Sequence, residues 1–227
     1  MIKATQKDLQ EIIKMVEGSK KLLVAGCGTC VSVCFAGGEK EVGLMTSELK
    51  MALSMAGKKV DIEQVVMQRQ CEKEFIEEVE DKIEDRDSVL SLACGVGVQV
   101  LVKQYPAINI YPGLNTQFMG PPKEQGLWYE NCAGCGDCVL HLTGGICPVA
   151  RCAKNLLNGP CGGSQDGKCE VSKDTECGWN LIIERLKAKG KLDDLAKIWQ
   201  VKDWRPSAHG GPRQIVREDL LLKKEDE

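Results

Sequence analysis

The composition of this 227-residue chain is that of a folded, globular protein. Hydrophobic residues make up 43% and charged residues 28% of the sequence, which is enough to bury a core, and the length suits one large or two small domains. The formal net charge is only -3, from 30 basic and 33 acidic residues, so neither nucleic acid nor an anionic membrane is favoured as a partner. No apolar run approaches the roughly 18–20 residues of a membrane span, and the first residues lack the apolar stretch of a secretory signal. We therefore expect a cytoplasmic protein that is not inserted in a membrane.

Cysteine is the residue whose abundance is most informative, since the chain contains 13. Thiols stay reduced in the cytoplasm, so a surplus of this size indicates metal binding or redox chemistry rather than a disulfide scaffold. The odd number also excludes a monomer in which every cysteine is disulfide-bonded. Metal sites with four cysteine ligands could use most of these residues and leave one spare.

Apolar spacing predicts that helices and strands alternate over the first part of the chain. In chain order we expect a helix that begins at a capping box of Thr5 and Asp8 and ends at Gly18, a strand over 21–26, a short helix over 31–36, a longer helix from Val42 to Ala56, a strand over 58–67, a helix over 72–85, a strand over 88–93, a helix over 98–105 and a strand over 107–111. This alternation indicates βαβ units and a parallel sheet. We predict an α/β domain over residues 1–112, three-layered in the Rossmann or flavodoxin manner.

The remainder of the chain has a different composition. Residues 113–127 are rich in Pro, Gly, Asn and Gln and are typical of a linker. Residues 128–202 hold eight of the 13 cysteines among many glycines, so we expect an irregular, ferredoxin-like or zinc-ribbon-like domain that needs inorganic groups for stability and ends in helices around 179–186 and 195–199. The polar tail, residues 203–227, is expected to be extended or to order on a partner.

Five cysteines lie in the predicted α/β domain, at or just beyond the carboxyl ends of its strands. Parallel strands bring these ends to one crevice, where ligands gather, so the five are predicted to form a metal site with one spare cysteine if a single four-ligand cluster binds. The alternative for the last two is that they are small buried hydrophobic residues. The five candidate ligands are Cys27, Cys30, Cys34, Cys71 and Cys94.

A dinucleotide site at the same place is less well supported. Gly26 and Gly28 begin a G-x-G-x-x-G pattern, but Val31 occupies the position of the third glycine, and no acidic residue follows the second strand. We therefore interpret the crevice as a metal site. A stand-alone nucleotide-binding oxidoreductase remains a weaker hypothesis, which NAD(P)H binding to the isolated chain would support.

The second group of cysteines begins with a C-x2-C-x2-C run followed later by Cys-Pro, which resembles the bacterial ferredoxin pattern with a longer final spacing. Eight thiolates suffice for two four-iron clusters; two structural zinc sites are the alternative. His141 lies among them, but a hydrogen-bonding or exposed role is favoured over ligation, and the chain shows no convincing general base or catalytic residue. The eight candidate ligands are Cys132, Cys135, Cys138, Cys147, Cys152, Cys161, Cys169 and Cys177.

Three segments carry a resemblance to a known family. Residues 131–171 (NCAGCGDC…GKCEV) are similar to the cysteine-rich C-terminal domain associated with methylenetetrahydrofolate reductases. Together with residues 26–43 (GCGTCVSVCFAGGEKEVG) and 91–99 (SLACGVGVQ), they closely resemble the MetV family, the small iron–sulfur subunits of MetVF-type methylenetetrahydrofolate reductases in acetogenic and related anaerobes.

The resemblance implies a specific function, which the composition and the cysteine spacing alone do not predict. It implies two or three [4Fe-4S] clusters, held by the N-terminal and C-terminal cysteines named above, that pass electrons to FMN or FAD in a MetF-type partner subunit. That partner would reduce 5,10-methylenetetrahydrofolate to 5-methyltetrahydrofolate in the methyl branch of the Wood–Ljungdahl pathway. Ferredoxin, NADH or a heterodisulfide-reductase-like complex would be the donor. The competing hypothesis is a zinc-stabilised subunit that only docks the flavin subunit to a larger complex.

Overall fold

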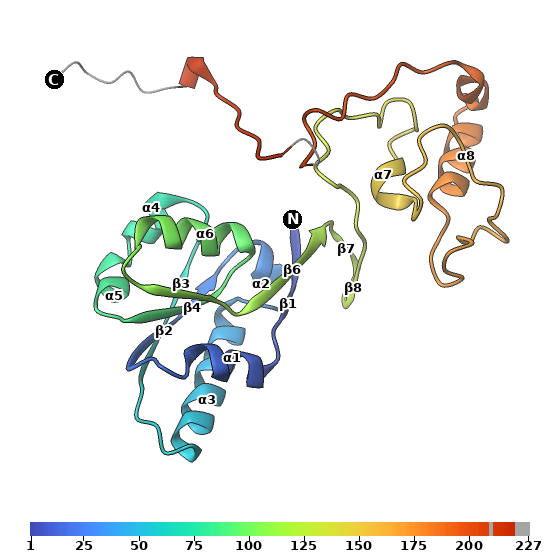
Figure 1. Cartoon of the computed structure of the whole chain (residues 1–227). Coiled ribbons are helices and arrows are strands. Elements are labelled where there is room, and N and C mark those ends of the chain that lie inside the picture. Colours follow the sequence, from blue (N-terminus) through green and yellow to red (C-terminus); the bar gives the residue numbers. More distant parts are fainter. Residues whose placement is uncertain (209–210, 221–227) are drawn as a thin grey trace. The chain divides into compact units, whose positions relative to one another are not determined.

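The computed structural model describes residues 1–208 and 211–220, and the chain divides into two compact units, Met1–Tyr129 and Glu130–Glu227 (Figure 1). Within these described residues no helix is both long enough and apolar enough to cross a bilayer.

The first unit is built on a sheet of four parallel strands in the order β3-β2-β4-β5. These are β2 (Lys21–Cys27), β3 (Asp61–Met67), β4 (Ser88–Leu92) and β5 (Asn109–Pro112). Leu22 is aligned with Ile62 on one side and with Ser88 on the other, so β2 is central and all four carboxyl ends share one edge. The predicted parallel α/β sheet is thereby confirmed. Because the chain first moves outward from β2 to β3 and then crosses to β4 on the other side, the order reverses between β2 and β4, where open α/β sheets bind ligands.

Helices cover both faces of this sheet, as Figure 1 shows. On one face, α1 (Leu9–Val16) and α3 (Glu39–Met55) pack on Leu22 and Val24 of β2. On the other, α4 (Lys73–Glu77), α5 (Glu80–Glu84) and α6 (Gly95–Gln104) pack on Leu23 and Ala25. Successive side chains of a strand point to opposite faces, so the unbroken apolar run of β2 serves two cores. A short helix, α2 (Cys30–Val33), follows β2.

The first helix and the helix after β3 differ from the prediction. Asp8, not Thr5, caps α1, and its Oδ1 accepts a 2.8 Å hydrogen bond from the Gln10 amide. Thr5 belongs instead to β1 (Ile2–Gln6). The helix predicted over 72–85 is two short helices, α4 and α5, that meet at Val79.

The predicted linker over residues 113–127 is wrong for most of its length. β6 (Leu114–Met119) pairs antiparallel with β1, and β7 (Pro122–Glu124) pairs with β8 (Leu127–Trp128). Of the six β6 residues only Leu114 is buried, so this strand lacks the apolar pattern by which strands are predicted. Backbone pairing with the first residues of the chain makes the segment part of the first unit.

The second unit has little regular structure, as expected from its composition. Its helices are α7 (Pro148–Arg151) and α8 (Gly178–Ala188), with 3-10 turns η1 (Leu192–Ala196) and η3 (Glu218–Leu220). The buried hydrophobic cluster consists of Cys177, Trp179, Ile182 and Leu186. The Trp179 indole donates a 2.9 Å hydrogen bond to the Leu156 carbonyl. Such a small core cannot by itself order nearly a hundred residues.

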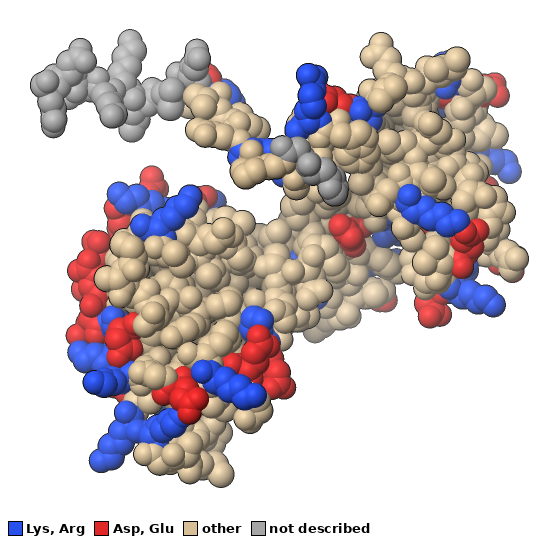
Figure 2. Space-filling view, viewed as in Figure 1, with Lys and Arg blue, Asp and Glu red and all other residues tan. Residues whose placement is uncertain are grey.

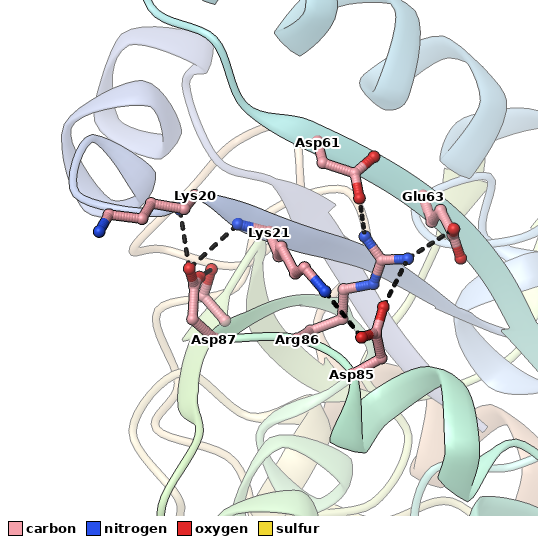
Figure 3. Close-up of polar contacts among 8 residues, drawn as sticks. Lys20, Lys21, Asp61, Glu63, Asp85, Arg86 and Asp87 are labelled. Carbon is pink, nitrogen blue, oxygen red and sulfur yellow. Dashed lines mark hydrogen bonds and ion pairs between the residues drawn. The ribbon is translucent and has the colours of Figure 1, made fainter.

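Ion pairs join the strands at the amino edge of the sheet (Figure 3). The Arg86 side chain is 3% exposed, and its guanidinium lies 2.6 Å from Asp61 and 2.5 Å from Glu63, both on β3. Asp87 accepts hydrogen bonds of 2.9 and 3.0 Å from the amides of Lys20 and Lys21. Figure 2 shows acidic and basic side chains interspersed on the visible face of this unit. The ion pairs and hydrogen bonds of Arg86 and Asp87 therefore join neighbouring segments of this edge locally.

We expect Asp87→Asn to destabilise the chain by about 1 kcal/mol at pH 7. Hydrogen bonds from amides to a charged carboxylate stabilise a protein more than hydrogen bonds to a neutral acceptor, even at an exposed site. Burial opposes ionisation of Asp87, but the Lys20 and Lys21 amides and the Ser88 hydroxyl outweigh it and hold the pKa below its ordinary value. A lowered folded-state pKa stabilises above the unfolded pKa near 3.9, and the contribution disappears as the pH falls through the folded value. Urea unfolding should therefore show a difference at pH 7 that shrinks toward pH 3. Glu48→Gln, on the exposed side of α3, is the control; an equal loss at both pH values would contradict the prediction.

Candidate functional site

The carboxyl edge of the parallel sheet gathers four cysteines from different parts of the sequence. Cys27 is the last residue of β2, and Cys30 is the first of α2. Cys94 follows β4 and caps α6, whereas Cys71 lies just beyond β3. Three neighbouring parallel strands thus deliver four of the five cysteines expected there to one edge.

The Cys71 thiol is within electrostatic reach of two of the other three. The pKa of the Cys71 thiol is raised, first because surrounding protein atoms desolvate it, and then because Cys27, and to a lesser degree Cys94, would place like charge nearby. The Cys27 Sγ lies 3.6 Å from the Thr29 hydroxyl and 3.9 Å from the Gln68 carbonyl oxygen, so it faces the loop after β3. A bound cation would reverse this electrostatic effect, because it stabilises thiolates.

Cys34 is separated from the other four. It is 3% exposed and belongs to the core beneath β1. Its Sγ accepts a 3.4 Å hydrogen bond from the Ala4 amide and lies 3.6 Å from the carbonyl oxygens of Ala4 and Val31. The structure therefore places four thiols at the sheet edge and the fifth in the core.

Gln70 ties the strand ends together directly behind Cys71. Its side chain is fully buried, and its amide nitrogen donates to the carbonyls of Ala25 (2.9 Å) and Gly26 (2.8 Å) on β2. Its amide oxygen accepts a 2.6 Å hydrogen bond from the Ser91 hydroxyl on β4. A Cβ on Gly97 would lie 2.9 Å from the Gln70 Cβ, so α6 also packs closely here. Gln70 was not among the residues predicted from the sequence, although a polar residue directly before a strand-end cysteine is a usable signal.

In the second unit, backbone amides point at cysteine sulfurs. The Gly134 amide donates to Cys132 Sγ (3.4 Å), the Ala150 amide to Cys147 Sγ (3.4 Å) and the Gly163 amide to Cys161 Sγ (3.5 Å). Gly134 and Gly162 have φ values of +61° and +80°, which glycine adopts without strain. Amide donors stabilise thiolate charge and tune iron–sulfur groups.

The other five cysteines of this unit lie on the same loops or at the core. Cys135 and Cys138 share the loop of Cys132, Cys177 caps α8 inside the small core, and Cys152 packs against that core. Cys169 begins the next turn, in which its amide donates a 2.9 Å hydrogen bond to the Thr175 carbonyl. His141 is exposed and, with Cys138 and Trp199, lines a cavity of about 520 Å³.

Within residues 1–208 and 211–220, no three Cys, His, Asp or Glu side chains stand close enough together to enclose a metal ion. The thiols share loops and edges without meeting at one point. The donor set nevertheless fits thiophilic metals, because thiolate ligands select zinc and iron–sulfur groups and amides already point at three of the sulfurs. The thiolates of a four-iron cluster bind different irons, so they are held further apart than the ligands of a single ion.

We expect Gln70→Ala to lower the free energy of unfolding by about 2–3 kcal/mol, because a buried Ser91 hydroxyl and two strand carbonyls lose their partner. Gln68→Ala, in the same loop but exposed, is the matched control and should change stability by less than about 0.5 kcal/mol. Chemical denaturation measures both. Equal effects of the two substitutions would show that the buried amide does not join the strands.

Comparison with known proteins relates the second unit to a family. Residues 111–205 match the family described as "Methylene-tetrahydrofolate reductase C terminal". The matched segment contains all eight cysteines of the second unit. No curated protein and no solved structure matches the chain. The cysteine-rich unit of this chain is therefore similar to the C-terminal region of methylenetetrahydrofolate reductases.

Proposed function

We propose that this chain is the electron-transferring iron–sulfur subunit, of the MetV type, of a methylenetetrahydrofolate reductase. The observation that carries the proposal is the set of amide donors aimed at cysteine sulfurs inside the segment that matches the reductase family. Loops of this kind suit thiolate-bound iron. In the proposal, electrons from ferredoxin or a heterodisulfide-reductase-like complex cross this chain to FMN or FAD in a MetF-type partner.

The second unit would hold two four-iron clusters with its eight cysteines, and the first unit a third. We assign the third to Cys27, Cys30, Cys71 and Cys94, since these lie at the sheet edge, and leave out Cys34, whose sulfur bonds the backbone of β1. When bound, such clusters supply one-electron transfer at a potential set by charge, hydrogen bonds and exposure.

The chain's own residues would fix the positions and the electronic surroundings of the sulfurs. The amides of Gly134, Ala150 and Gly163 stabilise thiolate charge at their cysteines. In the first unit, Gln70 holds the loop that presents Cys71. Reduction of 5,10-methylenetetrahydrofolate to 5-methyltetrahydrofolate would take place on the partner, as the flavin belongs there.

The alternative is a zinc-stabilised docking subunit of the same complex. The observation behind it is the small core of the second unit, which needs an inorganic group but not a redox-active one. Zinc has no accessible redox change, so this chain would then hold the complex together while electrons enter elsewhere.

Metal analysis of anaerobically purified protein tests the electron-transfer proposal. We expect roughly eight to twelve irons per chain, as two or three four-iron clusters contain, with matching sulfide and a visible absorbance that dithionite bleaches. Cys135→Ser should then leave folate binding by the flavin subunit intact but slow reduction of its flavin by the donor in stopped-flow measurements. A colourless protein with stoichiometric zinc would establish the docking alternative.

Cysteine variants test the assignment in the first unit. Alanine at Cys27, Cys30, Cys71 or Cys94 should lower the iron content by about four per chain, the content of one cluster. Cys34→Ala is the matched control, because it removes a thiol from the same C-x2-C-x3-C run; it should keep full iron while losing some stability. If Cys34→Ala loses the iron and Cys94→Ala keeps it, with both variants folded by circular dichroism, the assignment is wrong.

A further inference from the structure

The segment of the chain between η1 and η3 folds back onto one cysteine loop. We call the described residues 202–208 and 211–213 the C-terminal strap, and residues 132–138 the triple-cysteine loop. The Asp203 amide donates a 2.9 Å hydrogen bond to the Asp137 carboxylate, and the Lys202 ammonium donates to the Asp137 carbonyl. Further along the strap, Arg213 donates a 2.8 Å hydrogen bond to the Gly134 carbonyl. The contacts thus reach both halves of the loop.

Close packing accompanies these hydrogen bonds. A Cβ added to Gly136 would lie 2.3 Å from the Pro206 Cβ and 2.9 Å from the Pro206 carbonyl oxygen. Gly136 also has a φ of +86°, which other residues adopt only with strain. The conformation of the loop and the path of the strap therefore depend on each other. Ser207, which follows Pro206 in the strap, is 2% exposed. The strap is therefore packed against the rest of the unit at this point.

The strap brings two cations to backbone carbonyls of the triple-cysteine loop. Lys202 is 6% exposed, and its ammonium contacts a carbonyl and the Trp204 ring, whose centroid is 5.0 Å away. The neighbouring Asp203 carboxylate is engaged by Arg205 at 2.8 Å. Burying an ammonium that has mostly neutral contacts is costly. Negative charge on the thiolates and on a group bound to them would offset that cost.

We infer that the C-terminal strap is the element that positions the triple-cysteine loop and raises the reduction potential of the group it holds, with Lys202 and Arg213 as positioning residues. The effect on the reduction potential rests on the proposed function, because it requires a bound redox group. The positioning role rests on the hydrogen bonds and packing alone. Nearby positive charge favours the more negative, reduced form. Loss of either cation should therefore make reduction harder and the loop looser.

The test compares Lys202→Met and Arg213→Gln in the full chain with Lys187→Met on α8 and Arg217→Gln beyond the strap. Lys187 and Arg217 are exposed, and Arg217 pairs with Asp219 rather than with the loop, so each control removes the same charge elsewhere. We expect both strap variants to bind normal amounts of iron at first, to lose part of it to a chelator several-fold faster, and to shift one midpoint potential to more negative values. The controls should leave the release rate and all potentials unchanged.

Hydrogen exchange separates this inference from the proposed function. Amides of residues 132–138 should exchange faster in both strap variants than in both controls, whichever metal the full chain carries. A chain without iron that still shows this difference would remove the electron-transfer proposal and leave the strap's positioning role standing. Strap variants that match the controls in exchange, chelator release and potential would overturn the inference. If Lys202→Met does not fold, Arg213→Gln, which alters an exposed residue, decides the outcome.

Discussion

The buried amide of Gln70 joins two neighbouring strands at the edge where the first unit collects its cysteines. Its nitrogen bonds two carbonyls of β2 and its oxygen bonds Ser91 of β4, while its own backbone leads into Cys71. A buried polar side chain whose donors and acceptor are satisfied specifies one arrangement, since every displacement leaves a partner unpaired. The relative positions of Cys27, Cys71 and Cys94 follow from that arrangement. A metal site at this edge would thus be preorganised by a residue that does not bind the metal.

The two edges of the same sheet are built from opposite chemistry. At the amino edge, Arg86 and its carboxylate partners neutralise one another locally, and the Asp87 carboxylate is bonded by backbone amides. At the carboxyl edge, desolvation and then the like charge that Cys27 and Cys94 would carry raise the pKa of the Cys71 thiol. The charges of the first edge are paired within the chain. The second is unfavourable as a set of thiolates unless a cation joins it.

The second unit holds its cysteines in place by other contacts than the first. Four buried hydrophobic residues are too few to order it, so its loops are shaped by glycines of positive φ, by amides that bond sulfur and by the strap from the C-terminal segment. Each of these features holds cysteines in place rather than adding apolar burial. If the unit binds a metal, its stability and that binding would be one property, as in small metal-binding domains.

The sequence by itself determined the parallel strands, because the apolar runs at 21–27 and 88–92 are legible without tertiary context, and it determined that cysteines follow them. Tertiary structure alone decided which thiols share the edge. Cys34 has the spacing of a ligand, yet its helix turns its sulfur into the core. Likewise β6 pairs with β1 through backbone hydrogen bonds that leave little apolar pattern, and Gln70 and Lys202 acquire their partners only across long stretches of sequence. Local periodicity records which face of an element is buried, whereas the partner of a polar group depends on which distant segment the fold brings beside it.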